Sequence, residues 1–238
     1  MNQNILYEDE DIMVIYKPAG IATQTARYNQ SDMVSELKNY LARRKGNTVT
    51  KEPYLGIVHR LDQPVEGILV FAKTKRAAAS LSEQVQDNRM KKYYFALVNG
   101  VPVMQEGELK HYLYKDGKAG CAIISEVQEK GAKPARLSYR LIKQIGEVSL
   151  LEVLLHTGRY HQIRAQLSYM GWPLVGDYKY GNRAAGQNVS GRNKDLALCA
   201  YRLCLIHPIS GEKLDYSIVP KNLSFSPFLP DKSDKIHS

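Results

Sequence analysis

Short apolar runs rich in β-branched and aromatic residues, each bounded by polar turns, constrain the fold of this chain most strongly. Such runs predict β-strands. Helix-like stretches are fewer and do not alternate strictly with the strands. This indicates an α+β fold with a mostly antiparallel mixed sheet flanked by helices and loops, rather than a doubly wound α/β fold. The predicted strands are Ile12–Tyr16, Ile68–Ala72, Tyr93–Val98, Ala135–Leu141 and Val148–Leu155, with similar runs around Leu196–Leu205 and Leu214–Val219.

Three segments have the spacing of amphipathic helices. Ser31 and Thr74 are expected to cap the first two, and the third covers His161–Met170, with Gly171 just past its end. In the first helix the apolar positions expected on one face are Met33, Val34, Leu37, Tyr40 and Leu41, and in the third they are Ile163, Leu167 and Met170. In the second helix Ala77, Ala78, Leu81 and Val85 are expected to face inward.

No repeat and no linker-like segment divides the chain, so one domain over residues 1–220 is the simplest organisation. Residues 221–238 contain Pro227 and Pro230 and a charged end, and are expected to form a partly frayed tail. The polar, basic stretch Asn182–Asp195 is expected to be an exposed loop.

The charge balance points to a polyanionic partner. The 33 Lys and Arg residues outnumber the 24 Asp and Glu residues, giving a net charge of +9. Nucleic acid is the commonest partner of such a protein, although a basic protein without one remains an alternative. The tyrosine content, 16 residues, suits base stacking as well as cores.

The three cysteines, Cys121, Cys199 and Cys204, have no paired spacing, so neither a disulfide framework nor a zinc site is expected. A reducing, cytoplasmic location fits best. The acidic N-terminal stretch lacks the apolar region of a secretory signal, and no run approaches the ~20 apolar residues of a membrane span.

Two segments concentrate polar residues. In GIVHRLDQPVEGILVFAK, His59, Arg60 and Asp62 lie between two apolar runs, which predicts a strand, a tight turn and a strand. An acid beside His and Arg at a strand end can face a groove, and a surface ion pair in a turn is the alternative.

The second segment is TGRYHQIR, at a loop-to-helix junction. Arg159, His161 and Arg164 gather there, and free N–H groups at a helix start suit a phosphate. A solvated cationic helix start is the alternative. No carboxylate lies at ligand spacing, so no metal is expected.

Taken together, these segments resemble the RluA-type family of RNA pseudouridine synthases. The similarity runs from residue 5 to about residue 220. Its motifs are ILYEDEDIMVIYKPAG, then GIVHRLD with Gly67 and Ala72-Lys73, then KYYFALVNG from Lys92, TGRYHQIRAQL with GWPLVGDYKYG, and LALCAYRLCLIHPISGE. HRLD alone is weak evidence, whereas the motifs in this order and spacing are highly specific.

The resemblance implies a cofactor-free isomerase that acts on RNA, either ribosomal or transfer RNA. The sequence does not give the oligomeric state, and a monomer without an obligate protein partner is the default expectation. The resemblance also implies that Asp62 is the catalytic carboxylate, that Tyr94 stacks on the flipped uracil, and that Arg164 pairs with Asp62. Arg60 would help to fill the gap left by the flipped base. RNA-contacting residues would be Arg60, His59, Lys92, Arg159, His161 and Gln162, with a phosphate grip from Arg43, Arg44, Lys45, Lys91, Arg159, Arg183, Arg192 and Lys194.

The implied roles agree with physical chemistry. A stacked base must be flipped out at a cost of about a few kcal/mol, and an aromatic platform returns roughly 1–3 kcal/mol per base. Burial raises the pKa of a carboxyl group, and a neighbouring arginine lowers it by roughly 1–3 units.

The chain departs from the family pattern at three places. Val65-Glu66 replace the usual Thr-Ser, so the loop that carries Asp62 is expected to differ in detailed shape from that of the family. Glu66 would raise the pKa of Asp62 if the two side chains face each other. Tyr160 stands where a smaller residue is usual. An N-terminal S4-like RNA-binding domain is not expected in residues 1–220.

Two other functions compete with the synthase. A non-catalytic RNA-binding protein on the same fold would bind RNA without modifying it. An RNA-cleaving hydrolase would use His59 or His161 as acid and base and would shorten the RNA.

Overall fold

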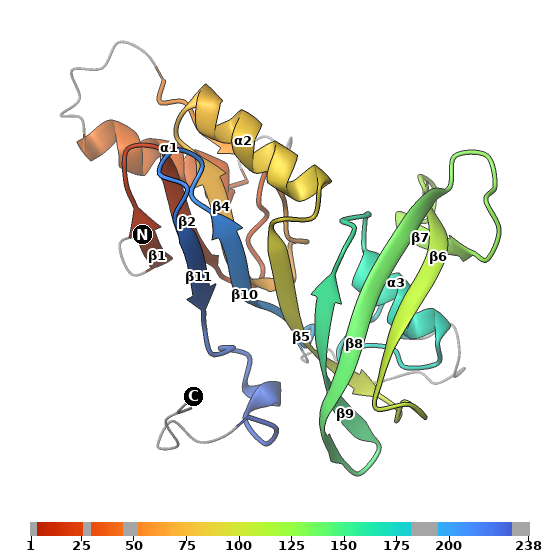
Figure 1. Cartoon of the computed structure of the whole chain (residues 1–238). Helices are drawn as coiled ribbons and strands as arrows, with labels where there is room; N and C mark the ends of the chain where they lie inside the picture. The colour runs from red at the N-terminus through yellow and green to blue at the C-terminus, as the bar shows by residue number, and fades with distance from the viewer. Residues whose placement is uncertain (1–3, 26–29, 45–51, 182–194, 230–238) are drawn as a thin grey trace. The chain divides into compact units, whose positions relative to one another are not determined.

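The computed structural model describes residues 4–25, 30–44, 52–181 and 195–229 (Figure 1). The chain divides into two compact units. The first unit comprises Met1–Lys92 and Ala200–Ile218, and the second comprises Tyr93–Cys199 and Val219–Ser238. A single domain over residues 1–220 therefore stays a prediction, and each unit is described by itself. No helix among the described residues combines the length and apolar character needed to cross a bilayer.

The first unit is built on a β-sheet whose strand pairs are mostly antiparallel. Its strands follow the order β1-β2-β4-β10, with β11 paired to β10 and the short β3 paired to β4. β2 and β4 are buried along their whole length, so both faces of the sheet are covered there. The strands are β1 (Ile5–Glu8), β2 (Ile12–Lys17), β3 (Gly56–Ile57), β4 (Glu66–Ala72), β10 (Leu198–Ile206) and β11 (Lys213–Ser217).

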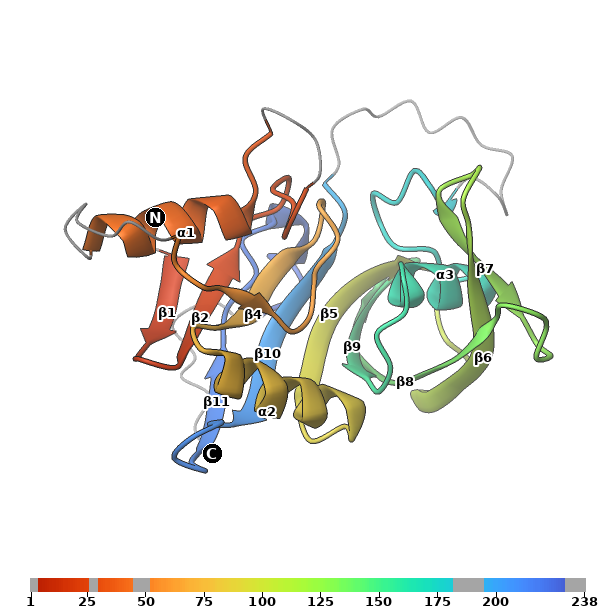
Figure 2. The same cartoon turned by 90° about the horizontal axis from the view of Figure 1, so that it is seen from above.

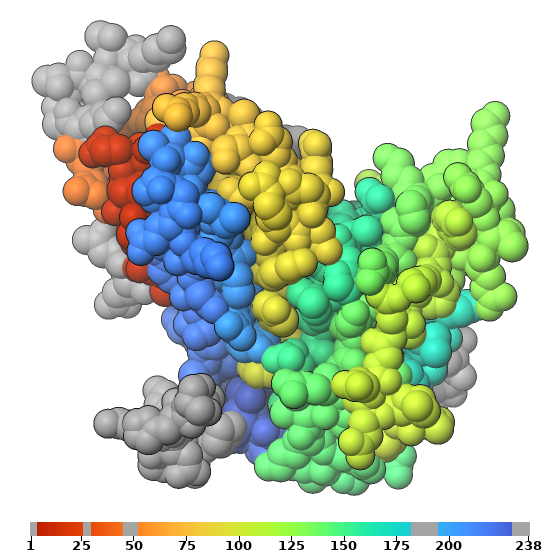
Figure 3. Space-filling view, viewed as in Figure 1, coloured from red at the N-terminus to blue at the C-terminus, as the bar shows by residue number. Residues whose placement is uncertain are grey.

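Two helices cover this sheet from opposite faces, α1 (Met33–Arg44) and α2 (Lys75–Gln86) (Figure 2). The apolar side of α2 packs on alternate residues of β2, β4 and β10 in one core cluster. In the space-filling view the yellow side chains of α2 lie directly against the blue side chains of β10 (Figure 3). Because both faces are sealed, β2 and β4 form a rigid base for the loops at their ends.

Gly67 marks a close approach of two strands in this sheet. Its φ is +139°, and a Cβ atom there would lie 2.5 Å from the Cβ atom and the carbonyl oxygen of Ala200 on β10. No side chain fits at that distance, so the glycine that follows Glu66 is required by packing as well as by backbone conformation.

The second unit is a twisted antiparallel sheet with one helix, α3 (Gln162–Tyr169). The strand order is β5-β9-β8-β6-β7. α3 packs beside β6 and β7 and shares a core cluster with them that includes Leu113, Ala135, Ala165 and Tyr180. The strands are β5 (Lys91–Asn99), β6 (Glu106–Asp116), β7 (Cys121–Ser125), β8 (Lys133–Ile145) and β9 (Val148–Leu155), and a 3₁₀ turn follows at Leu223–Phe225.

The α+β fold with mostly antiparallel pairing is confirmed, as are all seven predicted strands and three helices within a few residues. Thr74 caps α2 by accepting a hydrogen bond from the Ala77 N–H at 3.2 Å. The cap of α1 is Asp32 rather than Ser31: its Oδ1 accepts from the Ser35 N–H at 2.8 Å. A carboxylate one residue further along satisfies the same free N–H groups and also meets the helix dipole.

Candidate active site

The segment that carries Asp62 joins β3 to β4 in the first unit and is clamped on both sides of that residue. Before Asp62, the Thr23 hydroxyl accepts from the Leu61 N–H at 3.1 Å and donates to the Leu61 carbonyl at 2.9 Å. After it, the Gly20 N–H donates to the Gln63 carbonyl at 2.9 Å, and the Gln63 amide donates to the Gly20 carbonyl at 3.0 Å. The backbone on either side of Asp62 is therefore fixed without using its carboxylate.

Lys17 ties this loop to the sheet. It is the last residue of β2 and is 0% exposed. Its ammonium donates to the carbonyls of Pro18, Ile21 and Gln63 at 2.9, 2.7 and 3.1 Å. A lysine ammonium has three donors, so all three are satisfied by the chain segments that flank the site.

Lys17 also supplies positive charge near the carboxylate. Burial lowers the pKa of Lys17 to about 8, and the negative charges of Asp62 and Glu66 oppose that shift. The interaction is mutual, because a cation that is stabilised by Asp62 stabilises the ionised form of Asp62 in return. A cation that holds this acid charged was expected, but it was assigned only to Arg164.

Glu66 has its own partner within the first unit. Its side chain is buried at the start of β4, and its Oε2 accepts a hydrogen bond from the Tyr16 hydroxyl on β2 at 2.5 Å. Tyr16 precedes Lys17, whose charge also interacts with Glu66. The unusual glutamate is thus part of a buried tyrosine–carboxylate pair between neighbouring strands. The clamps around Asp62 do not involve the side chains of Val65 or Glu66.

His59 is neutral in the folded protein. Its Nε2 accepts from the Val70 N–H of β4 at 3.2 Å, which places the ring proton on Nδ1. Burial, followed by the positive charge of Lys92, lowers the pKa of His59 to about 3. The next residue, Arg60, is exposed, as expected of a side chain that contacts RNA.

In the second unit, Arg164 of α3 forms a buried bidentate ion pair with Asp177. Its Nε donates to Asp177 Oδ2 and its Nη2 donates to Asp177 Oδ1, each at 2.8 Å. The Arg164 guanidinium also lies over the ring of Tyr180, 5.1 Å from its centroid. The sequence reading missed Asp177, although it lies in the GWPLVGDYKYG segment that contributes to the family resemblance.

Tyr180 links this ion pair to His161. The Tyr180 hydroxyl accepts from the Ala122 N–H at 2.6 Å and lies 2.9 Å from His161 Nδ1, to which it can donate. Burial, with the charge of Arg164 next, lowers the pKa of His161 to about 3, so its ring is neutral. His161 has a left-handed backbone, with φ of 51°, and Tyr160 stacks on its ring at 3.8 Å.

Gln162 orders the turn before α3. It is buried, and its Oε1 accepts from the Thr157 hydroxyl at 2.8 Å and the Arg159 N–H at 3.0 Å. Its amide nitrogen donates to the Arg136 carbonyl at 3.1 Å. The Nε of Arg159 donates to the Pro134 carbonyl at 2.9 Å. The contacts of Gln162 and Arg159 with RNA stay predictions, and their visible role is to shape this turn.

The three predicted catalytic residues belong to different units. Asp62 lies in the first unit, whereas Tyr94 on β5 and Arg164 on α3 lie in the second. The Tyr94 side chain is 5% exposed. The pairing of Arg164 with Asp62 and the stacking role of Tyr94 therefore stay predictions.

The predicted phosphate grip is described in part. Arg43 and Arg44 are exposed at the end of α1, and Arg44 pairs with Glu8 at 2.9 Å. Lys91 is half-buried at the start of β5. Lys45, Arg183, Arg192, Lys194 and all of Asn182–Asp195 except Asp195 lie outside the described residues, as does the tail from residue 230. Within the described ranges, no group of three His, Cys, Asp or Glu residues could hold a metal ion.

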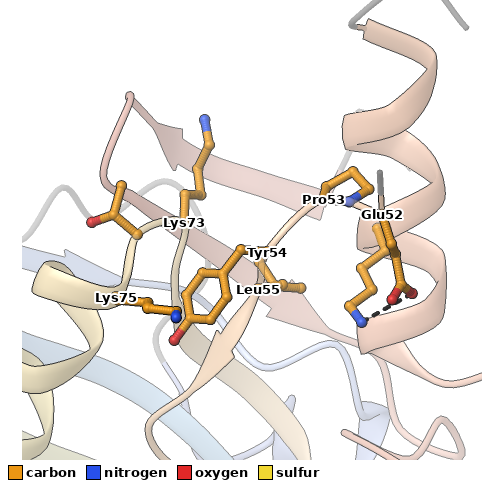
Figure 4. A pocket seen from close by; sticks show the side chains of 8 residues that line it. Glu52, Pro53, Tyr54, Leu55, Lys73 and Lys75 are labelled. Carbon is orange, nitrogen blue, oxygen red and sulfur yellow. Dashed lines mark hydrogen bonds and ion pairs between the residues drawn. The ribbon is translucent and has the colours of Figure 1, made fainter. Parts of the chain in front are cut away.

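The described cavities lie elsewhere in the first unit. One of about 470 Å³ is lined by Tyr54, Lys73 and Lys75 beside the start of α2 (Figure 4). Two cations at its walls are already paired, Lys38 with Glu52 at 3.0 Å and Lys73 with Glu8 at 2.9 Å. Glu52 adjoins residues 45–51, which the structure does not describe, so this cavity carries no functional assignment.

Comparison with known proteins agrees with the motifs. Residues 11–169, more than half of the chain, match the RNA pseudouridylate synthase family. The chain belongs to the RNA pseudouridine synthase family. An uncharacterized RNA pseudouridine synthase of Synechocystis is 35% identical over 230 residues, covering 95% of this chain and 68% of that protein. A ribosomal large subunit pseudouridine synthase D of Zymomonas mobilis is 35% identical over 219 residues, covering 89% and 67%.

A solved structure supports the same conclusion. Human RNA Pseudouridylate Synthase Domain Containing 4 has a TM-score of 0.75 and 25% identity, covering 94% of this chain and 92% of that one. The family, the fold class and the isomerase class predicted from the ordered motifs are confirmed. The chain spans about two thirds of the length of the two sequence relatives.

Proposed function

We propose that this protein converts uridine to pseudouridine within structured RNA, with Asp62 as the catalytic carboxylate. The observation that carries the proposal is the position of Asp62 in the HRLD segment, on a loop clamped by Thr23, Gly20 and Lys17. A loop held at both flanks keeps a reacting carboxylate in one place, and such positioning can account for a large part of a catalysed rate.

The reaction needs no net addition or loss of atoms. The bond between ribose C1′ and uracil N1 breaks, uracil turns, and a bond from C1′ to C5 forms. C5 loses a proton and N1 gains one, so the product is an isomer of the substrate. Asp62 would act at C1′ in its ionised form, which the neighbouring Lys17 charge favours. Tyr94 would stack on the flipped uracil and return part of the unstacking energy.

The class of RNA substrate is inferred from the relatives. Ribosomal RNA is favoured because relatives covering about nine tenths of this chain are named ribosomal large subunit pseudouridine synthases, and transfer RNA remains the second candidate. The net charge of +9 suits either polyanion. We place the protein in the cytoplasm, acting as a monomer without an obligate protein partner.

Replacing Asp62 by Asn tests the assignment. Purified wild type is expected to form pseudouridine in ribosomal RNA from cells that lack this gene, and the Asp62→Asn variant is expected to lose at least about a thousandfold in rate with RNA affinity nearly unchanged. The amide keeps the size of the side chain but removes the charge. Modification by the variant at the wild-type rate would refute the role of Asp62.

The two competing functions predict different products. A non-catalytic RNA-binding protein would give no pseudouridine with the wild type on any RNA. A hydrolase would shorten the RNA, whereas an isomerase leaves its length and mass unchanged. The pKa of about 3 for both His59 and His161 disfavours the hydrolase, because neither imidazole can exchange protons efficiently near neutral pH.

A further inference from the structure

Tyr160 precedes α3 in the second unit, and its ring is held in place by two contacts. The ring stacks on the His161 imidazole, with centroids 3.8 Å apart and planes 22° from parallel. Its hydroxyl donates to the carbonyl of Gly120, in the turn between β6 and β7, at 3.0 Å. Adjacent side chains of a helix do not face each other, and the left-handed backbone of His161 lets these two rings stack. Tyr160 is thereby fixed in one orientation although 39% of it is exposed.

The other face of the Tyr160 ring carries a lysine ammonium. Lys115, near the end of β6, places its Nζ atom 4.8 Å from the ring centroid. An imidazole stacked at 3.8 Å leaves no room for an ammonium on the same side, so Lys115 lies over the face that is turned away from His161. That face is therefore covered by an exposed, flexible side chain rather than by residues of the core.

A second ammonium lies at the same turn. Lys179 donates from Nζ to the Gly120 carbonyl at 2.7 Å, so this carbonyl accepts from both Tyr160 and Lys179. Among the described residues neither Lys115 nor Lys179 pairs with a carboxylate, since the first contacts a ring and the second a carbonyl. An anion can therefore bind both ammonium groups without breaking an ion pair within the described part of the chain.

We propose that the Tyr160 ring, with the Lys115 and Lys179 ammonium groups beside it, binds a nucleotide of single-stranded RNA other than the reacting uridine. The base would stack on the ring face that Lys115 covers, and the displaced ammonium would pair with a phosphate of the same strand. Stacking strengthens RNA binding by roughly 5- to 150-fold per base, whereas an exposed cation–π contact contributes roughly 2- to 5-fold. A base can therefore displace Lys115 from the ring.

Two features favour a nucleotide over a simple anion. An anion alone would use the two ammonium groups and leave the ring without a role, whereas an aromatic face beside cations is the combination that single strands bind. The Tyr160 ring is also fixed before RNA arrives, by its stack and its hydroxyl bond, which reduces the entropy lost on binding. A smaller residue is usual at this position in the family, so this contact would set the RNA preference of this chain apart. The inference rests on the proposed function only in taking RNA as the ligand.

The first experiment observes the ring directly in the full chain, with carbon-13 labelling of tyrosine rings in the Asp62→Asn background, so that no reaction occurs. The Tyr160 signals are assigned from the spectrum of Tyr160→Phe. Single-stranded oligouridylate is the probe, and inorganic phosphate reports the anion alone. Oligouridylate is expected to shift the Tyr160 ring protons upfield, because a stacked base adds its ring current, and phosphate is expected to leave them in place. Unmoved Tyr160 signals at saturating oligouridylate would overturn the proposal.

The second experiment measures the affinity of the same Asp62→Asn protein for transcribed large-subunit ribosomal RNA. Tyr160→Ser removes the ring and is expected to weaken binding about tenfold, whereas Tyr160→Phe keeps the ring and is expected to stay within about twofold. Lys115→Met is expected to reduce the slope of log affinity against log salt by about 0.7, one phosphate contact of a single strand. Tyr169→Ser is the matched control and is expected to change neither. It removes a tyrosine of the same unit that is 49% exposed and bonded through its hydroxyl to Glu126.

Thermal unfolding separates a folding defect from a binding defect. Tyr160→Phe loses the bond to Gly120 and Tyr160→Ser loses the stack as well, so affinities are compared at a temperature at which every variant is folded. Equal weakening by the two variants would assign the loss to the hydroxyl, and no weakening by either would leave the ring outside the RNA contact, so each result refutes the proposal. Pseudouridine formation by the wild type is scored separately. A shifted Tyr160 signal without pseudouridine would refute the reaction alone, and pseudouridine without a shifted signal would refute the nucleotide site alone.

Discussion

Asp62 in the first unit and Arg164 in the second are held in different ways. Around Asp62 the contacts are made to backbone groups of its neighbours, by Thr23, Gly20 and Lys17. Arg164 is held through its own side chain, by both carboxylate oxygens of Asp177. The first arrangement fixes a loop through its backbone groups. The second fixes a guanidinium directly.

This difference explains which sequence changes each region tolerates. The Asp62 loop accommodates Val65 and Glu66 in place of the usual Thr and Ser because its clamps use other residues, and Glu66 bonds to Tyr16 instead. The Asp177 position has no such freedom, because the Arg164 guanidinium would lose its ion pair if Asp177 changed. Val65 and Glu66 therefore disturb the Asp62 loop less than their closeness to Asp62 suggests.

The largest effect is expected from Lys17→Met, which removes the central clamp of the first unit. Three carbonyls lose their donor, so the free energy of unfolding is expected to fall by about 3–6 kcal/mol. Pseudouridine formation should fall as well, because the Asp62 loop loses its anchor and a nearby positive charge. Denaturant unfolding and single-turnover rates measure the two losses.

Lys92→Met is the matched control for this change, since Lys92 is also a largely buried lysine but makes no hydrogen bond or ion pair within the described part of the chain. It is expected to leave stability unchanged or raised. If Lys17→Met and Lys92→Met destabilise the protein equally, burial of a lysine stem rather than hydrogen bonding to the loop holds the first unit together.

A smaller effect is expected from Asp177→Asn in the second unit. The amide preserves shape, but Arg164 loses its buried counter-charge, and the free energy of unfolding is expected to fall by about 3 kcal/mol. Hydrogen exchange should quicken in α3 and leave α1 and α2 unaffected. Asp215→Asn, at the exposed ion pair with Arg202, is the control and is expected to change stability by less than about 1 kcal/mol. Equal losses from the two variants would mean that the Arg164 pair is no stronger than a surface pair.

The sequence predicted the regular elements well where a buried strand or an amphipathic helix left a clear periodicity. It missed β1, β6 and the short β7. In β6 (Glu106–Asp116) only Leu109 and Leu113 are buried, so no apolar run marks the strand. α3 was expected to have one apolar face, yet Gln162, Arg164 and Gln166 are buried as well. Polar side chains inside a core depend on partners distant in sequence, which periodicity does not report.

The candidate site shows the same limit. The motifs located Asp62 and Arg164, but not the partners that hold them. Lys17 lies 45 positions before Asp62, and its neighbour Tyr16 meets Glu66 from 50 positions away. These contacts follow from the antiparallel register of β2 with β4, which sets Lys17 opposite Gly67. The register of β2 against β4 is known only once the two strands are paired. The contacts of Lys17 with the Asp62 loop could therefore not be predicted from the sequence alone.

The smallest effect is expected from His161→Asn, which tests whether the second unit is the more acid-sensitive one. The pKa of His161 is about 3 in the folded protein, against an ordinary value of 6.5. Between these values the unfolded chain binds a proton that the folded protein does not, so stability is present above pH 6.5 and is lost as the pH falls toward 3. Asparagine does not titrate and tolerates the left-handed backbone at this position. The variant is therefore expected to lose less stability than the wild type between pH 6.5 and 4, and hydrogen exchange is expected to change in α3 alone.

His59 in the first unit also has a pKa of about 3 and supplies the comparison. If His161→Asn leaves the pH dependence unchanged, the acid sensitivity resides with His59 and the carboxylates, and the distinction between the two units fails on this point.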